Sequence, residues 1–239
     1  MMDIPSEIEE VLEKIYKQTK PVSIFIYGSR AREDYKENSD YEIGVLYKKE
    51  NYIQRKDLNK LHSLNKLNIF PFFYNDFIKY QLDTPFPKSI YLREVIAGGK
   101  TIKGKRIIEN IKPPSIKLID LLEGVVFQQG YALAATHSYK QNDLVTSSTH
   151  FTKSLLYGMR VLIILEKKEF PLTFDEIVEA GKRLIPDGEV NDLMVHAIDV
   201  RNGKKPDIDM LYANISFLNK VVLKKVKAEL QKGDRIILQ

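Results

Sequence analysis

Hydrophobic and polar positions follow two different patterns along the chain, and the change falls about half-way. Up to residue 111, short apolar runs that predict strands are interleaved with segments of helical period. From residue 112 onward, the apolar positions recur at helical spacing. We therefore expect an α/β (α+β) domain with a small mixed sheet over residues 1–111, followed by an all-α helical bundle domain over residues 112–239.

The first helix is expected to begin at Ser6, which can cap its N-terminus while Glu9 completes a capping box. Strands are expected at residues 22–27, 41–47, 67–74 and, as a short strand or hairpin arm, 100–108. Helices are expected at residues 29–35, 53–64 and 88–97, the last of them stopped by Gly98 and Gly99. Pro71 favours an edge position or a bulge for the third strand.

The sequence around Pro113 and Pro114 is the expected linker, and Ser115 is a candidate cap for the next helix. Only helices are expected beyond it, at about residues 116–139, 147–168, 173–184, 190–200 and 207–231. Thr173 is predicted to cap the third of these, with Glu176 as its capping-box partner. The chain ends in an apolar tail, 236–238, which suggests docking or a homodimer.

Composition narrows the class of protein. The chain of 239 residues is 44% hydrophobic, and it has no apolar run long enough for a membrane span. Its acidic N-terminus does not resemble a signal peptide. The absence of cysteine excludes disulfides and zinc–thiolate sites and agrees with a cytoplasmic location. The net charge of +5 permits a polyanionic partner, although a lysine-rich surface has the same balance.

One stretch, residues 22–47, carries the candidate chemistry. Gly28 and Ser29 follow the first apolar strand, and glycine lets the backbone approach a phosphate closely. Asp40 and Glu42 lie two residues apart at the next strand, so their carboxylates share one face and favour a cation between them. An ordinary turn and two solvent-facing acids are each common alone, but their combination at this spacing indicates a nucleotide site.

These residues resemble the DNA polymerase β-type nucleotidyltransferase superfamily. The matching segments are 25–32 (FIYGSRAR) and 39–43 (SDYEI), and they are most similar to the minimal, kanamycin-nucleotidyltransferase-like branch. The helical half resembles the HEPN-like or acceptor-binding bundles that accompany such domains. The resemblance implies transfer of a nucleoside monophosphate from a nucleoside triphosphate, ATP above all, to an acceptor hydroxyl, with release of pyrophosphate.

The resemblance also implies roles for individual residues. Gly28 and Ser29 would hold the β- and γ-phosphates, and Arg30 and Arg32 would add positive charge near them. Arg32 has an alternative, an ion pair with neighbouring Glu33 or Asp34. The metal would be Mg²⁺ or Mn²⁺. Its ligands, the carboxylates of the catalytic pair, would be Asp40 and Glu42.

The family's third carboxylate is missing at its expected place. Asn68 stands there, and an amide oxygen can ligate a metal but cannot act as a base. Either the alignment slips and Asp76 contributes from the end of the strand, or catalysis is weakened while nucleotide binding is kept. Glu123, in the helical half, is a further candidate base.

The acceptor is left open by the sequence: a small molecule such as an aminoglycoside-like compound, a protein side chain, or an RNA end. Residues 128–131 could line an acceptor pocket, or simply pack at Gly130. The alternatives to a small-molecule enzyme are a non-catalytic, antitoxin-like regulatory protein, which Asn68 favours, and an RNA-tailing enzyme, which the positive charge favours. We expect no HEPN ribonuclease activity, because no histidine follows Arg201 at the required spacing.

Overall fold

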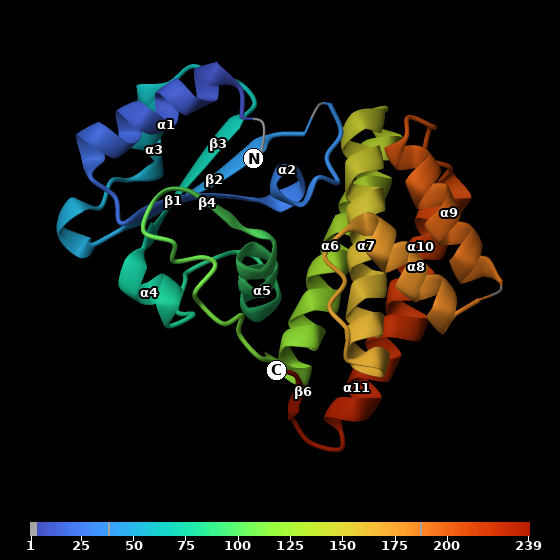
Figure 1. Cartoon of the computed structure of the whole chain (residues 1–239). Helices are drawn as coiled ribbons and strands as arrows, with labels where there is room; N and C mark the ends of the chain where they lie inside the picture. The colour runs from blue at the N-terminus through green and yellow to red at the C-terminus, as the bar shows by residue number, and fades with distance from the viewer. Residues whose placement is uncertain (1–3, 38, 187) are drawn as a thin grey trace. The chain divides into compact units, whose positions relative to one another are not determined.

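The computed structural model describes residues 4–37, 39–186 and 188–239. It divides into two compact units, Met1–Pro114 and Ser115–Gln239, and the division falls next to the proline pair of the expected linker. Each unit is described by itself below, with the element labels of Figure 1.

The first unit is built on a four-stranded sheet of order β3-β2-β1-β4. β1 pairs antiparallel with both β2 and β4, whereas β2 and β3 run parallel, so the sheet is mixed as predicted. The strands are β1 (Ser23–Tyr27), β2 (Tyr41–Tyr47), β3 (Leu67–Phe73) and β4 (Lys100–Gly104). The helices are α1 (Ser6–Thr19), α2 (Gly28–Arg32), α3 (Arg55–Leu58), α4 (Tyr74–Ile78) and α5 (Lys88–Gly98). Because β3 is an edge strand, the prediction made from Pro71 is confirmed.

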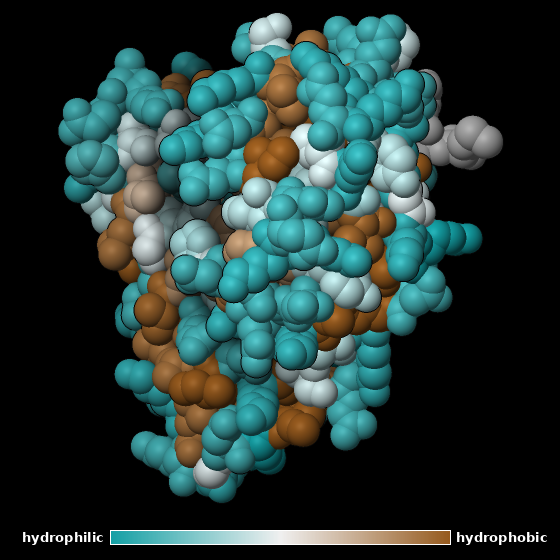
Figure 2. All heavy atoms as spheres, turned by 90° about the vertical axis from the view of Figure 1, so that its left-hand side faces the viewer, coloured by the Kyte–Doolittle hydropathy of each residue, from teal (hydrophilic) through white to brown (hydrophobic). Residues whose placement is uncertain are grey.

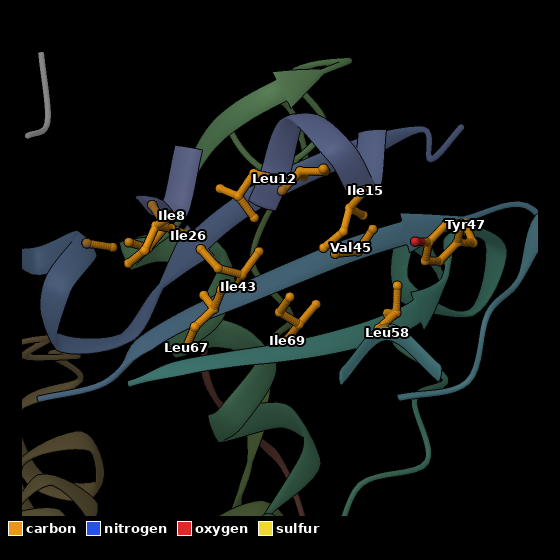
Figure 3. Close-up of a cluster of buried hydrophobic side chains, with 12 residues drawn as sticks. Ile8, Leu12, Ile15, Ile26, Ile43, Val45, Tyr47, Leu58, Leu67 and Ile69 are labelled. Atoms are coloured by element: carbon orange, nitrogen blue, oxygen red, sulfur yellow. The ribbon is translucent and has the colours of Figure 1, made fainter. Parts of the chain in front are cut away.

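Both faces of this sheet are buried. On one face, α1 and α3 pack over alternate residues of β1, β2 and β3. Figure 3 shows these side chains in contact with one another. Leu12 and Ile15 of α1 pack there and are fully buried. The other face carries the intervening residues of β1 and β2, packed mainly against aromatic residues and α5. Burial on both sides explains why β1 reads as a continuous apolar run and not as an alternating one.

Gly44 makes room for an aromatic ring in the second of these layers. It pairs directly with Phe25 across β1 and β2. A Cβ atom at position 44 would lie 2.1 Å from Cζ of Phe25, so the ring covers the bare α-carbon. The Phe25 ring also lies 5.6 Å, centroid to centroid, from that of Phe77 on α4. The glycine therefore fixes how the aromatic layer packs on the central strand.

Three local predictions in this unit are wrong. α1 is capped by Pro5 and not by Ser6, because the Pro5 carbonyl accepts the amide N–H groups of Ile8 and Glu9 at 2.9 and 3.0 Å. The helix expected at residues 29–35 ends at Arg32, since Glu33 adopts the left-handed conformation with φ +67°. The helix expected at residues 53–64 is only α3 followed by a 3₁₀ turn, Asn59–Leu61.

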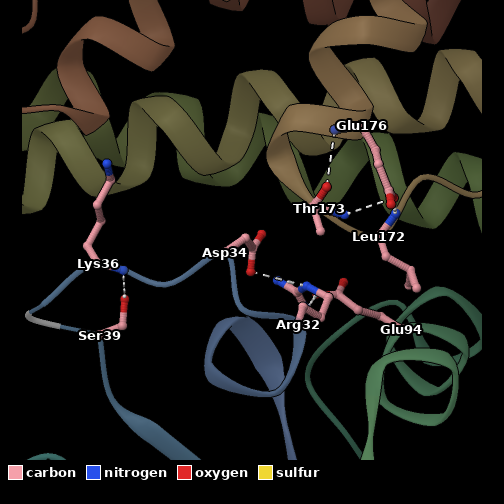
Figure 4. Close-up of polar contacts among 8 residues, drawn as sticks. All are labelled: Arg32, Asp34, Lys36, Ser39, Glu94, Leu172, Thr173 and Glu176. Atoms are coloured by element: carbon pink, nitrogen blue, oxygen red, sulfur yellow. Dashed lines mark hydrogen bonds and ion pairs between the residues drawn. The ribbon is translucent and has the colours of Figure 1, made fainter.

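The second unit consists mainly of helices. They are α6 (Leu118–Lys140), α7 (Leu144–Lys167), α8 (Phe174–Leu184), α9 (Glu189–Arg201), α10 (Ile208–Phe217) and α11 (Lys224–Leu230), with a π-helical turn, Leu218–Leu223, between the last two. The capping box predicted for α8 is confirmed: Thr173 Oγ1 accepts from the Glu176 amide at 3.1 Å, and the Glu176 carboxylate accepts from the Thr173 amide (Figure 4).

The expectation of helices alone in this unit is wrong, because two short strands pair antiparallel: β5 (Ile116–Lys117) and β6 (Ile236–Leu238). α6 consequently begins at Leu118, and Ser115 does not cap it; the Asp120 carboxylate accepts from the Lys117 amide at 2.7 Å instead. The apolar tail is thus bound within its own unit, with Ile237 buried. The homodimer stays a prediction.

Figure 2 shows polar side chains over most of the face in view, with hydrophobic ones reaching the surface in patches. Across the described ranges, no helix combines the length and the apolar character that crossing a membrane requires.

Replacing Gly44 by Ala should lower stability by about 1–3 kcal/mol, because the added methyl group must displace the Phe25 ring from a packed layer. Gly130→Ala is the matched control: a Cβ atom at this position of α6 would meet no heavy atom within 4 Å, so the substitution should raise stability by about 0.5–1 kcal/mol. Urea unfolding followed by circular dichroism measures both. Equal effects of the two substitutions would contradict the packing argument.

Stability should fall as the pH decreases below about 6.5, the ordinary histidine value, partly because of His196. Burial lowers the pKa of this residue, and Lys204 lowers it further. Its Nε2 accepts from the Asp207 amide at 3.3 Å, which requires the neutral ring. The unfolded chain therefore binds a proton at this pH more readily than the folded chain does. Protonation consequently stabilises the unfolded state relative to the folded state.

The His196→Gln variant keeps an acceptor for the Asp207 amide but does not titrate. Its urea midpoint should decrease less between pH 7.5 and pH 5.5 than that of the wild type. An identical decrease in both proteins would show that His196 has no part in the pH dependence.

Candidate functional site

The candidate residues of the segment 22–47 meet at one edge of the first unit. β1 ends at Tyr27, and its antiparallel pairing sets Tyr27 opposite Glu42 near the start of β2. The parallel pairing of β2 with β3 then sets Glu42 beside Asn68. Consequently the turn at Gly28, the acid pair and the position of the missing third acid lie on three neighbouring strands.

Gly28 and Glu42 approach each other so closely that a side chain at position 28 would require the Glu42 carboxylate to move. A Cβ atom there would lie 1.9 Å from Oε2 of Glu42, and the Gly28 φ of +74° disfavours any other residue. The Glu42 carboxylate therefore lies against the backbone of the turn. Gly28 itself is buried, and Glu42 is half-buried.

Asp40 and Asn68 are joined directly. The Asn68 side-chain amide donates to Oδ2 of Asp40 over 2.9 Å. Asp40 precedes β2 and is exposed, while Glu42 and Asn68 are half-buried. Asp40, Glu42 and Asn68 thus present carboxylate and amide oxygens at one edge, which is the donor type that Mg²⁺ and Mn²⁺ prefer.

A site made of two carboxylates and one neutral amide carries less negative charge than a site made of three carboxylates. In the described part of the chain, no group of three or more His, Asp or Glu side chains is arranged to hold a metal ion. The donor set nevertheless suits a divalent cation that keeps other ligands from phosphate and water, as Mg²⁺ usually does.

Arg30 contacts the loop before β2. Its Nε and Nη2 donate to the Ser39 carbonyl at 3.2 and 3.0 Å, and Nη2 also donates to the Glu37 carbonyl at 3.1 Å. Its guanidinium carbon lies 4.1 Å from the ring centroid of Tyr35 and 4.5 Å from that of Tyr41. These partners differ from the phosphate contact predicted for Arg30, which stays a prediction.

Arg32 forms the ion pair that the sequence offered as its alternative role. Its Nε lies 3.4 Å from Oδ1 of Asp34, and its Nη1 donates to Oε1 of Glu94 at 2.9 Å (Figure 4). The side chains of Arg32 and Asp34 are each only 6% exposed. Glu33, the other proposed partner, pairs with Lys100 at 3.1 Å. Arg32 thereby links the end of α2 to α5.

Sequence reasoning missed two tyrosines beside the acid pair. The hydroxyls of Tyr27 and Tyr91 lie 3.3 Å apart. Burial is the main reason why the pKa of Tyr91 is raised to about 12, and the negative charge of Glu42 acts in the same direction. Burial likewise raises the pKa of Tyr27 well above its ordinary value. Both remain neutral hydroxyls at pH 7. No periodic pattern links a residue of α5 to the end of β1, so only the fold brings them together.

The candidate base Asp76 is not gathered at this edge. Asp76 lies in α4, after the far end of β3, whereas Asn68 lies near its start. A strand of this length spans about 20 Å, so Asp76 cannot replace the missing acid, and the proposed slip of the alignment is wrong. Glu123 belongs to α6 in the second unit and is exposed.

Comparisons with known proteins agree with this geometry. Residues 8–106 match the family model described as polymerase beta, nucleotidyltransferase. No curated protein matches the chain by sequence. Among solved structures, the chain is similar to spectinomycin adenyltransferase AAD(9) from Enterococcus faecialis, solved with ATP and spectinomycin. The TM-score is 0.54 at 14% sequence identity, over 91% of this chain and 97% of that chain.

At this identity the structural likeness shows a shared fold, a nucleotidyltransferase domain followed by helices. The family match covers the turn at Gly28, the acid pair and Asn68. Residues 8–106 therefore form a nucleotidyltransferase domain of the polymerase β family.

Proposed function

We propose that the chain transfers a nucleoside monophosphate from ATP to a hydroxyl group of a small acceptor molecule and releases pyrophosphate. The observation that carries this proposal is the contact between the Glu42 carboxylate and the Gly28 turn, with Asp40 and Asn68 on the adjoining strands. It sets a backbone turn suited to phosphate beside oxygen ligands suited to a cation.

In this proposal, Gly28 and Ser29 hold the phosphates through their backbone amides, and the missing side chain at Gly28 leaves room for the Glu42 carboxylate beside the turn. With only five residues, α2 has too little dipole to be the main attraction. Asp40 and Glu42 would hold Mg²⁺ or Mn²⁺, with Asn68 as a neutral ligand. When bound, the cation supplies positive charge that offsets the charge on the phosphates in the displacement.

The reaction forms a bond between the acceptor oxygen and the α-phosphorus, and it breaks the bond between that phosphorus and the bridging oxygen of pyrophosphate. The acceptor proton must leave to a carboxylate or to water, because the Asn68 amide cannot take it. The rate would then depend mainly on positioning and on charge neutralisation.

The similar solved structure supports ATP and a small molecule as the two substrates in this proposal. Spectinomycin adenyltransferase has the same fold over nearly its whole length and was solved with a nucleotide and an antibiotic. A protein or RNA acceptor has no comparable support, and the positive net charge by itself does not favour RNA over a lysine-rich surface.

A second candidate function is nucleotide binding without catalysis, as in a regulatory protein. The observation in its favour is Asn68, which both lacks the charge of the third acid and donates a hydrogen bond to Asp40. That bond occupies a carboxylate oxygen otherwise available to a cation. Measuring binding and transfer separately distinguishes the two functions.

Calorimetric titration with ATP should show binding that strengthens with Mg²⁺, and Gly28→Ala should abolish it, because the methyl group would meet the Glu42 carboxylate. Gly203→Ala is the matched control: it imposes the same type of strain, at φ +105°, in open space within the second unit. Incubation with labelled ATP and hydroxyl-bearing antibiotics then tests transfer. Absence of metal-dependent ATP binding in the wild type would overturn the proposal, and binding without transfer would favour the regulatory candidate.

Replacing Asn68 by Asp should raise the rate of nucleotidyl transfer by about tenfold or more, because it restores a charged ligand and a possible base. The same variant should need less Mn²⁺ for half-maximal nucleotide binding. It should also be less stable without metal, since a carboxylate replaces the amide that donates to Asp40.

Asn68→Ala is the control for this experiment, because it removes the hydrogen bond without adding charge. It should not gain activity. If Asn68→Asp changed neither transfer nor the Mn²⁺ requirement, position 68 would not belong to the cation site.

A further inference from the structure

We propose that Arg30 is a positioning residue for Asp40, and not a ligand of the phosphates. This inference rests on the proposed function, because it assigns Arg30 a role in that same site. Arg30 lies two residues after Gly28, so the phosphate turn and the cation ligand would be coupled through one side chain.

The contacts of Arg30 fall on both neighbours of Asp40. On one side, Nε and Nη2 both donate to the Ser39 carbonyl, at 3.2 and 3.0 Å. On the other side, the guanidinium lies over the Tyr41 ring, 4.5 Å from its centroid. The backbone carbonyl before Asp40 and the side-chain ring after it are therefore held by the same planar group, which limits where the Asp40 carboxylate can point.

Other contacts also hold the described residues of the loop that carries Asp40. The Lys36 N–H donates to Ser39 Oγ at 2.9 Å, the Ser39 N–H donates to the Lys36 carbonyl at 2.8 Å, and Lys66 Nζ donates to the Glu37 carbonyl at 3.3 Å. The Asn68 amide donates to Asp40 itself. The Tyr41 amide donates to the Lys66 carbonyl at 2.7 Å, where β2 begins. Tyr35, over which Arg30 also lies, is 46% exposed. Without Arg30, the segment between α2 and β2 would lose three hydrogen bonds and two ring contacts.

The chemistry of these contacts suits arginine and not lysine. The guanidinium donates through two adjacent nitrogens while its flat faces stack on aromatic rings. A lysine ammonium is a point charge, and it has neither two adjacent donor nitrogens in one plane nor a flat face that can stack on a ring. A phosphate ligand would behave differently, because lysine binds phosphate well as a point charge. The response to Arg30→Lys therefore distinguishes positioning from phosphate binding.

The test compares wild type, Arg30→Lys and Arg30→Met with Arg106→Met, whose arginine side chain is 76% exposed and far along the sequence. Three quantities are measured: ATP affinity without metal by calorimetry, Mn²⁺ affinity of the ATP complex by electron paramagnetic resonance, and amide hydrogen exchange of residues 33–41. Steady-state kcat and KM for ATP are measured with an acceptor identified as above.

Both Arg30 variants should weaken Mn²⁺ binding by about tenfold and lower kcat by a similar factor, while metal-free ATP affinity and the KM for ATP change less than about threefold. Exchange at residues 33–41 should accelerate in both variants, and Arg106→Met should match the wild type. A role in general stability alone would not produce this division between kcat and KM.

A phosphate role would give the opposite result: a loss of metal-free ATP affinity in Arg30→Met, restored in Arg30→Lys, with Mn²⁺ binding unchanged. That outcome would overturn the inference. Unchanged exchange at residues 33–41 would also overturn it. Failure of the wild type to bind ATP would instead overturn the proposed function, and the exchange measurement would still decide whether Arg30 holds the loop of Asp40.

Discussion

The close contact between the Glu42 carboxylate and the bare α-carbon of Gly28 is the constraint on which the candidate site depends. Antiparallel pairing of β1 with β2 brings the end of one strand to the start of the other. The absence of a side chain at Gly28, together with its φ of +74°, lets the carboxylate occupy the space beside the turn. A larger residue at position 28 would require the Glu42 carboxylate to move away from the turn.

The sheet behind this contact is rigid because both of its faces are buried. Glu42 lies on the face whose other residues, Phe25 and Leu46 among them, belong to an aromatic-rich layer. The site is thus the polar end of an otherwise apolar surface. The hydroxyls of Tyr27 and Tyr91 lie between the apolar layer and the polar groups of the site. Burial and the charge of Glu42 keep both hydroxyls protonated.

The two arginines that follow the Gly28 turn have partners within the first unit. Arg32 is paired with Asp34 and Glu94, and Arg30 donates to backbone carbonyls. Asn68, at the position where the sequence predicts a third carboxylate, donates to Asp40. The first unit thus has the fold of a nucleotidyltransferase domain, and its proposed cation site has two carboxylates and one neutral amide. This balance is the physical basis of the choice between an enzyme and a nucleotide-binding regulator.

The sequence alone determined the features that depend on residues close together in the chain. These are the strands of the sheet, the edge position marked by Pro71, the turn at Gly28, and the capping box of Thr173 and Glu176. Such features follow from period, backbone freedom and hydrogen bonds that span three or four residues. The spacing of Asp40 and Glu42 likewise pointed to one shared edge.

Tertiary structure decided what depends on partners far apart in sequence. Glu94 pairs with Arg32 across 62 residues, and the final strand pairs with residues at the start of the second unit, which no local pattern encodes. The tertiary fold also separated Asp76 from the site, since it follows the far end of β3. Local period fixes which face of an element is apolar, but only chain packing decides which charged groups meet there.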